Sequence, residues 1–402
     1  MQRRELLKHL AAASLAGAAG QLMAAPAAQG NKLLLVFLRG GYDGASLLVP
    51  HTSSFYYEAR PRIAVPKPGA PNGALPLDAR WGLHPALADS MMPLYAKGQL
   101  AFLPFAGTDD LSRSHFETQD TIEFGQAPFG RRDYRSGFLN RLATVLNDGR
   151  STPEAIAFTS QMPIVLRGDA KAANVTLNAA GRPAIDDRQS KVIQAMYRDT
   201  PLGPAVVEGF EVRDAIARSI KAEMDDASRN ALTAKGFELV ARRMARLMRE
   251  RFDIAFVDVG GWDTHVGQGA GTGYLASRLE ELGRGVAGFA QEIGDDTWRN
   301  TVVVVISEFG RTFRENGTGG TDHGHGTVYW VLGGSLSAQA GGHVIGEQVD
   351  VSQPALFQNR DWPVLNEYRA VFAGLFARMY GLSPSQLDRV FAGVTPRDLQ
   401  LV

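Results

Sequence analysis

Acidic and imidazole side chains follow or flank several apolar segments of this chain. Three motifs stand directly after such a segment, and Gly-Gly-Thr-Asp-His-Gly-His-Gly at 319–326 stands before another. Zinc and manganese accept mixed histidine and carboxylate ligands, whereas magnesium and calcium prefer oxygen. Two adjacent ions can clamp the attacking and leaving oxygens of phosphoryl transfer. The pattern predicts a site for one or two divalent ions (zinc, manganese, magnesium or calcium). Its candidate ligands are Asp43, Asp263, His265, Glu308, Asp322, His323 and His325.

Each candidate ligand also has a structural interpretation. Asp43 stands before a glycine and could serve a turn, and Asp263 could cap the following helix. Glu308 could form an ion pair with Arg311. The histidines could be solvated loop residues, and the spacing leaves open which of those at 323 and 325 is a ligand. The joint occurrence of these groups in four motifs favours the metal interpretation over the separate ones.

A second group of polar side chains lies in Thr-Asp-Asp-Leu-Ser-Arg-Ser-His-Phe at 108–116, where a helix is expected to begin. Ser112 or Ser114 could be a metal-activated nucleophile, with water as the other choice, and Arg113 could hold a phosphoryl or sulfuryl group. Alternatively, Ser114 is a helix N-cap in a capping box and Arg113 pairs with a nearby aspartate. His115 is a ligand or a buried hydrogen-bond donor.

The elements that must position these residues are apolar runs ending in polar or glycine-rich motifs. Continuous apolar runs are typical of strands buried on both faces of a parallel sheet. Helical periodicity separates them, notably at 237–248 and 275–289. The sequence therefore predicts an α/β sandwich with helices flanking a mostly parallel sheet, and ligands bind such sheets outside the carboxyl ends of the strands. The predicted strands are 32–38, 100–105, 252–259, 301–307 and 328–332.

Composition excludes several classes of protein and of site. The 402 residues are 45% hydrophobic and include no cysteine, so disulfides, thiolate zinc sites, iron–sulfur clusters and cysteine nucleophiles are excluded. Lysine plus arginine and aspartate plus glutamate are both 42, so the overall charge gives no reason to expect nucleic acid as a partner. Any metal must be held by oxygen and nitrogen.

The first 28 residues are expected to be an export signal. Arg3 and Arg4 precede an Ala/Leu/Gly run over 10–25. This run is too short, and too rich in small residues, to form a stable membrane-spanning helix. The paired arginines favour the twin-arginine export machinery over general secretion. We therefore expect a periplasmic or otherwise exported protein whose main domain covers 29–402, with 151–226 as a cap or insertion.

In combination, the motifs at 39–44, 112–116, 260–265, 307–312 and 320–324 resemble an exported bacterial family, the domain of unknown function fifteen-oh-one. This family is distantly similar to the alkaline phosphatase and sulfatase superfamily. The resemblance implies an alkaline phosphatase-like three-layer sandwich with a metal cluster at the strand ends.

Three positions follow the superfamily pattern in this comparison, and one departs from it. Asp43 matches a metal-bridging aspartate, and Asp263 and His265 match a ligand loop. Phe309 stands where the superfamily has a histidine, which leaves open whether one or two ions bind. Without cysteine or the proline of the sulfatase motif, the formylglycine type of sulfatase is not expected.

Two functions are consistent with these observations. The first is an exported metal-dependent hydrolase of small anionic esters, with phosphate preferred over sulfate and attack by serine or water. The second is a non-catalytic metal-binding scaffold of the cell envelope with the same fold. The sequence does not determine the oligomeric state.

Overall fold

The computed structural model describes residues 30–129, 133–147, 154–177, 187–211 and 236–402. The predicted export signal lies outside these residues. Among the helices of the described part, none has the length and apolar character required to cross a membrane.

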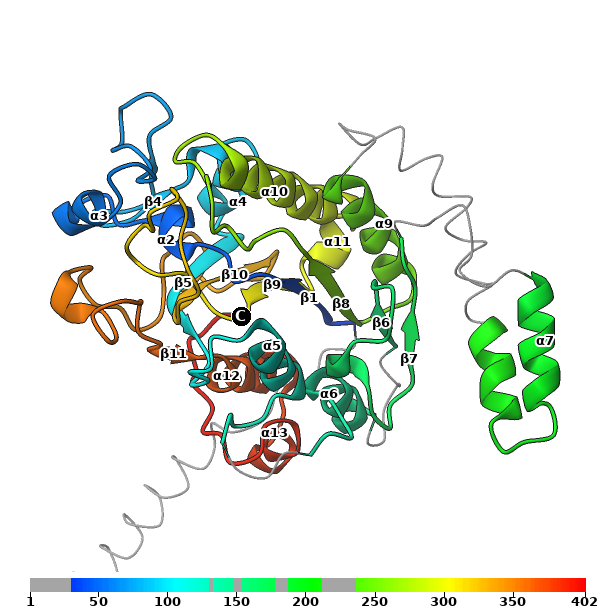
Figure 1. The fold of residues 1–402 in the computed structure, drawn as a ribbon. Helices are drawn as coiled ribbons and strands as arrows, with labels where there is room; N and C mark the ends of the chain where they lie inside the picture. Colours follow the sequence, from blue (N-terminus) through cyan, green and yellow to red (C-terminus); the bar gives the residue numbers. More distant parts are fainter. Residues whose placement is uncertain (1–29, 130–132, 148–153, 178–186, 212–235) are drawn as a thin grey trace, which may run out of the picture.

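The main sheet has eight strands in the order β11-β5-β10-β9-β1-β8-β6-β7 (Figure 1). Strand β10 runs antiparallel to both of its neighbours, and the other pairs are parallel. All five predicted strands are present, so the expectation of a mostly parallel sheet is confirmed. The strands are β1 (Lys32–Leu38), β5 (Leu100–Gly107), β6 (Ala155–Ala157), β7 (Ala172–Asn174), β8 (Ile254–Val259), β9 (Thr301–Ser307), β10 (Thr327–Gly333) and β11 (Asn366–Glu367).

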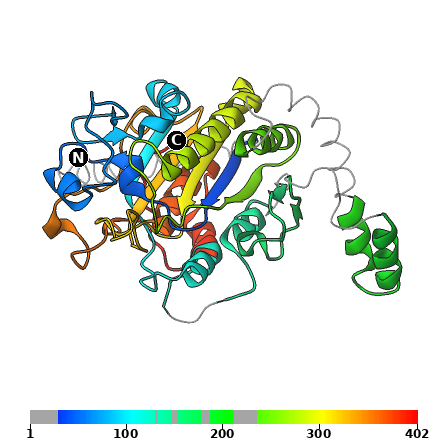
Figure 2. The same ribbon diagram turned by 45° about the horizontal axis from the view of Figure 1, so that its top comes forward.

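Helices cover both faces of this sheet and give the predicted three layers (Figures 1 and 2). Side chains alternate along β1, so Leu34 and Val36 belong to one apolar core while Leu33 and Leu35 belong to the other. The first core is closed by α9 (Phe237–Glu250) and α10 (Tyr274–Glu292). The second is closed by α5 (His115–Phe124), α6 (Phe138–Leu146), α12 (Tyr368–Tyr380) and α13 (Pro384–Val390).

Shorter elements surround these layers. Part of the expected cap at 151–226 contributes β6 and β7 to the main sheet, and its residues at 151–153, 178–186 and 212–226 lie outside the described part. A three-stranded sheet consists of β2 (Leu48–Val49), β4 (Gly82–Leu83) and β3 (Leu75–Pro76). The remaining elements are α2 (Gly44–Leu47), α3 (Ser54–Ala59), α4 (Met92–Ala96), α7 (Asp187–Tyr197), α11 (Asp295–Trp298), η1 (Pro85–Leu87), η2 (Ile164–Leu166) and η3 (Gln353–Ala355).

The register of the strands brings the predicted site loops to one edge. Leu38 pairs with both Val259 and Ser307, so β1, β8 and β9 end side by side. The loop at 319–326 precedes its strand and would lie at the opposite edge of a wholly parallel sheet. Because β10 is antiparallel to β9, this loop instead enters at the edge where the other three strands end.

A buried ion pair ties the loop after β1 to its surroundings. The Asp43 carboxylate accepts hydrogen bonds from Arg60 Nη1 at 2.6 Å and Nη2 at 3.1 Å, and both side chains are almost fully buried. Ser46 and Gln268 also donate to this carboxylate. Arg60 in turn donates to the carbonyl oxygens of Thr312 and Phe313, so one guanidinium links the loops after β1 and β9.

Removing Arg60 tests this arrangement. The Arg60→Met variant leaves the Asp43 charge buried and uncompensated, so the free energy of unfolding should fall by about 3–5 kcal/mol. Urea unfolding followed by circular dichroism measures the change. The control is Arg284→Met, which breaks the exposed pair with Glu280 and should cost about 0–1 kcal/mol. Equal losses in the two variants would contradict the role assigned to Arg60.

Candidate metal centre

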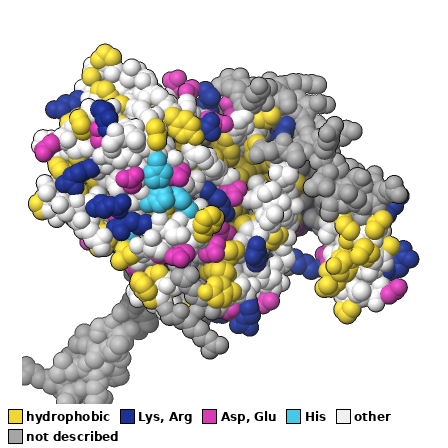
Figure 3. All heavy atoms as spheres, viewed as in Figure 1, with side chains coloured by type: hydrophobic (Ala, Val, Ile, Leu, Met, Phe, Trp, Pro, Cys, Tyr) yellow, Lys and Arg dark blue, Asp and Glu magenta, His cyan; other side chains and the backbone are white. Residues whose placement is uncertain are grey.

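Three histidines and one aspartate converge at the edge where β1, β8 and β9 end. Ligand atoms of His115, Asp263 and His323 lie within 4.8 Å of one another. His265 Nε2 lies 2.9 Å from Asp263 Oδ1 and 3.1 Å from His323 Nε2, and His115 Nε2 lies 3.6 Å from Asp263 Oδ2. Figure 3 shows histidine side chains grouped beside acidic ones on this face. Segments far apart in the sequence thus contribute to one cluster, the metal centre.

Glu308 fixes the orientation of His115. Its Oε1 accepts hydrogen bonds from His115 Nδ1 at 2.7 Å, from Gln119 Nε2 at 2.8 Å and from the Gly40 amide at 2.8 Å. Its Oε2 accepts from the Ser307 hydroxyl. Burial alone would raise the pKa of this carboxyl, but the donors of His115 and Gln119 outweigh burial and lower it. An ionised Glu308 therefore accepts a hydrogen bond from Nδ1–H of His115, and Nε2 is left as the ligand atom.

The other two histidines are oriented in the same way. His265 Nδ1 lies 3.1 Å from Asp322 Oδ1, and His323 Nδ1 lies 2.9 Å from the carbonyl oxygen of Arg113. The carbonyl oxygen assigns the proton of His323 to Nδ1, and Asp322 can take the Nδ1 hydrogen bond of His265 when its Nε2, 2.9 Å from Asp263 Oδ1, serves as a ligand. Desolvation by burial also lowers the pKa of His323, which favours the neutral form that a ligand needs. Every Nε2 of the cluster therefore presents a lone pair.

The donor set fits a divalent cation. His265 Nε2 and His323 Nε2 lie 3.1 Å apart, so one ring must donate to the other unless an ion takes both lone pairs, and His115 Nε2 is buried without a hydrogen-bond partner among the described residues. A cation relieves both problems. In a tetrahedral zinc site with Zn–N bonds of about 2.0–2.1 Å, ligand nitrogens lie roughly 3.3 Å apart. Three imidazoles and the Asp263 carboxylate are ligands that zinc and manganese accept.

Arg311 and Phe309 contact the candidate ligands and help to hold them in place. The Arg311 side chain is buried and donates to Asp263 Oδ1 and to the carbonyl oxygens of Gly40 and Trp262. Partial burial would raise the pKa of Asp263, but the bonds from Arg311 outweigh it, so the pKa is lowered. The Phe309 ring packs against the imidazoles of His115 and His323, with centroids 4.9 and 5.1 Å away.

The structure separates the predicted ligands into two groups. Asp263, His265 and His323 lie in the metal centre. Glu308 and Asp322 contact Nδ1 of His115 and His265, so in this structure they orient histidines. Arg311 pairs with Asp263, and no contact supports the expected pair with Glu308 among the described residues.

Two other predicted ligands lie apart from the centre. The Asp43 carboxylate is bound by Arg60, Ser46 and Gln268, and no contact joins it to the three histidines among the described residues. His325 is buried against Phe357, and desolvation lowers its pKa to about 4. Neither belongs to the group of His115, Asp263 and His323, whose ligand atoms lie within 4.8 Å of one another.

The residues predicted as nucleophile and anion clamp have protein partners. Ser114 is the N-cap of α5, as its structural interpretation anticipated, and Ser112 contacts the Thr118 hydroxyl at 3.2 Å. The Arg113 guanidinium is bound to Asp361 and Gln358. Arg113 contributes its backbone instead: its φ of 52° is in the left-handed region, and its carbonyl oxygen holds His323.

Replacing Glu308 tests the orientation of His115. Glu308→Gln should weaken zinc binding about 10- to 100-fold, because the amide no longer fixes Nδ1–H on His115 as firmly. Competition with a chromophoric chelator measures the affinity. The matched control is Glu117→Gln, a change on the exposed first turn of α5 that should leave zinc affinity unaltered. Equal affinity of Glu308→Gln and the unmodified protein would refute the assignment.

Solved structures resemble this chain at low sequence identity. One is the lipoteichoic acid synthase LtaP from Listeria monocytogenes, with 9% identity, a TM-score of 0.40, and coverage of 93% of this chain and 76% of the other. A protein in the alkaline phosphatase superfamily from Vibrio parahaemolyticus has 11% identity, a TM-score of 0.35 and coverage of 77% and 62%. Alkaline phosphatase from the Antarctic bacterium TAB5 has 11% identity, a TM-score of 0.29 and coverage of 75% and 91%. At such low scores, the likeness lends no support to a shared substrate.

Sequence comparison identifies the family directly. No curated protein matches the chain. A family model described as "Protein of unknown function (DUF1501)" matches residues 31–391, which agrees with the resemblance carried by the motifs. The chain belongs to this family.

Proposed function

We propose that this protein is a metal-dependent hydrolase of phosphate esters, with sulfate esters as the second choice of substrate. The observation that carries the proposal is the convergence of three imidazole Nε2 atoms on Asp263, each with its Nδ1 turned to an acceptor. The ligands would be His115, His265, His323 and Asp263. A zinc or manganese ion held there would supply Lewis-acid stabilisation of a phosphoryl or sulfuryl oxygen.

The position of helix α5 supports an anionic substrate. His115 is the first residue of this helix, so the backbone N–H groups of the first turn and the positive end of the helix dipole lie beside the metal centre. Both favour a negatively charged group at this position. A small phosphate or sulfate ester is therefore the substrate class that we assign.

Water is the nucleophile that fits the site best. Ser114 serves as the helix cap and Ser112 is bound to Thr118, so neither hydroxyl is held toward the three histidines by the contacts it makes. Attack by water needs no serine at these positions. The carboxylates of Glu308 and Asp322 contact Nδ1 of His115 and His265 and so would hold these two rings in place while water attacks.

We further propose that the protein acts outside the cytoplasm. The support is the sequence of the first 28 residues, with Arg3 and Arg4 before an Ala-rich run. Export of a folded chain by the twin-arginine machinery would allow the metal to be inserted before export.

A non-catalytic scaffold of the cell envelope is the second candidate. The observation that favours it is that Arg113 is bound to Asp361 and Gln358, so the expected anion clamp is engaged within the protein. In this case the ion would stabilise the loops and no ester would be turned over.

Activity and metal content together distinguish the two candidates. The protein loaded with zinc or manganese should hydrolyse aryl phosphate monoesters or diesters, and His323→Ala should lower kcat/KM by about a hundredfold or more through loss of a ligand. The control is His343→Ala, at an exposed histidine outside the centre.

Each alternative result has a definite reading. A bound ion without turnover of phosphate or sulfate esters would support the scaffold. Failure of the folded protein to bind a divalent ion would overturn both candidates, because both place the ion on the same four residues.

A further inference from the structure

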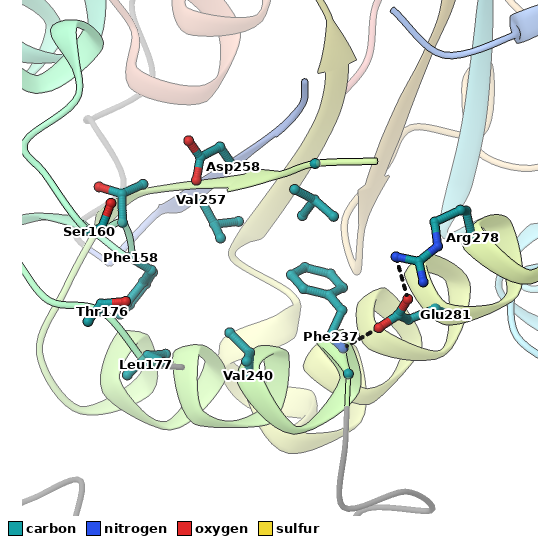
Figure 4. A pocket seen from close by; sticks show the side chains of 14 residues that line it. Phe158, Ser160, Thr176, Leu177, Phe237, Val240, Val257, Asp258, Arg278 and Glu281 are labelled. Atoms are coloured by element: carbon teal, nitrogen blue, oxygen red, sulfur yellow. Dashed lines mark hydrogen bonds and ion pairs between the residues drawn. The ribbon is translucent and has the colours of Figure 1, made fainter. Parts of the chain in front are cut away.

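A cavity of about 500 Å³ opens beside the metal centre, between the end of β8, the strand β6 and the helices α9 and α10 (Figure 4). Its lining combines two kinds of side chain. The rings of Phe158 and Phe237 and neighbouring aliphatic groups give it an apolar floor. Hydroxyl and charged groups of Ser160, Asp258 and Arg278 give it a polar wall. The volume lies in the range of small-molecule sites.

The polar wall has capacity to bind a ligand. Asp258 Oδ2 accepts a hydrogen bond from Arg39 Nε at 2.7 Å, yet the Asp258 side chain is 35% exposed. Arg278 pairs with Glu281 at 3.2 Å through Nη1, and its side chain is 37% exposed. The cavity therefore offers an acceptor on one side and donors on the other.

The cavity adjoins the loop that carries Asp263. A Cβ on Gly261 would lie 3.7 Å from Arg278 Cδ, so this cavity residue packs on backbone only two positions before the metal ligand. Two residues span at most about 7 Å. A Cβ on the preceding Gly260 would meet nothing within 4 Å. Gly260 lines the cavity and lies three positions before Asp263, so the cavity adjoins the loop that carries this candidate ligand.

A chain of hydrogen bonds also joins the two places. Asp258 is bound to Arg39 Nε, Arg39 Nη1 donates to Gln119 Oε1 at 2.8 Å, and Gln119 Nε2 donates to Glu308 at 2.8 Å. Glu308 orients His115. The cavity wall and the innermost histidine are therefore parts of one polar network.

We infer that this cavity holds a hydroxyl-rich group, a sugar or polyol, of the ester whose charged end lies at the metal centre. Such a group has C–H faces that suit the two phenylalanine rings, and hydroxyls that both donate to Asp258 and accept from Arg278. A hydrocarbon chain could make no hydrogen bond with the exposed parts of the Asp258 and Arg278 side chains. This inference rests on the proposed function and extends it to the class of substrate.

Binding of hydrolysis-resistant analogues tests the inference without requiring turnover. Calorimetry on the zinc-loaded protein compares phosphonate analogues of hexose and pentose phosphates with methylphosphonate. The best sugar analogue should bind about tenfold or more tightly, the gain expected from one or two hydrogen bonds. Ser160→Leu fills the cavity and should abolish this gain, whereas the matched Ser385→Leu on α13 should preserve it.

The outcomes separate the cavity from the metal centre. The inference is overturned if every sugar analogue binds like methylphosphonate, or if Ser160→Leu keeps the gain. If methylphosphonate does not bind at all, the proposed function fails at the metal centre. In that case, binding of a sugar analogue that is lost in Ser160→Leu still supports the inference about the cavity. Absence of such binding overturns the inference.

Discussion

An imidazole ring can present a lone pair to a metal only when its other nitrogen carries the proton, and this constraint organises the whole carboxyl edge of the sheet. His115, His265 and His323 each direct Nδ1 at an acceptor, and these acceptors come from three different segments. Glu308 must therefore be ionised although it is buried, which explains the three donors on its Oε1. Each acceptor belongs to a different loop from the histidine that it orients. The loops must therefore be held in place relative to one another before the histidines can be oriented.

Two buried arginines fix those loops. Arg60 joins the segment after β1 to that after β9, and Arg311 binds carbonyl oxygens of three segments as well as Asp263. Close backbone packing completes the arrangement. A Cβ on Gly320 would lie 2.4 Å from the backbone of His265, and one on Gly324 would lie 2.3 Å from that of Arg311. At these two positions, only glycine lets the loop before β10 approach the others.

The sequence was sufficient for the layered architecture and for part of the metal centre. Apolar runs and helical periodicity reflect burial directly, so the strands and the main helices could be predicted. Asp263, His265 and His323 could be grouped because their motifs directly follow or precede such apolar runs. The carboxylates that contact these histidines could not be told apart from ligands, because the position of Glu308 in the sequence is the same whether it binds an ion or a histidine. The ion pair of Asp43 could not be predicted, because its partner Arg60 belongs to no motif. The position of His115 depends on how α5 begins, which the sequence left open.

The pairing of Arg311 with Asp263 has a consequence for the charge balance of the centre. The aspartate is already compensated by a permanent cation before any ion arrives, and the three imidazoles are neutral ligands. The two carboxylates that contact the histidines, Glu308 and Asp322, remain to balance the charge of a divalent ion, so the occupied centre would be close to neutral overall.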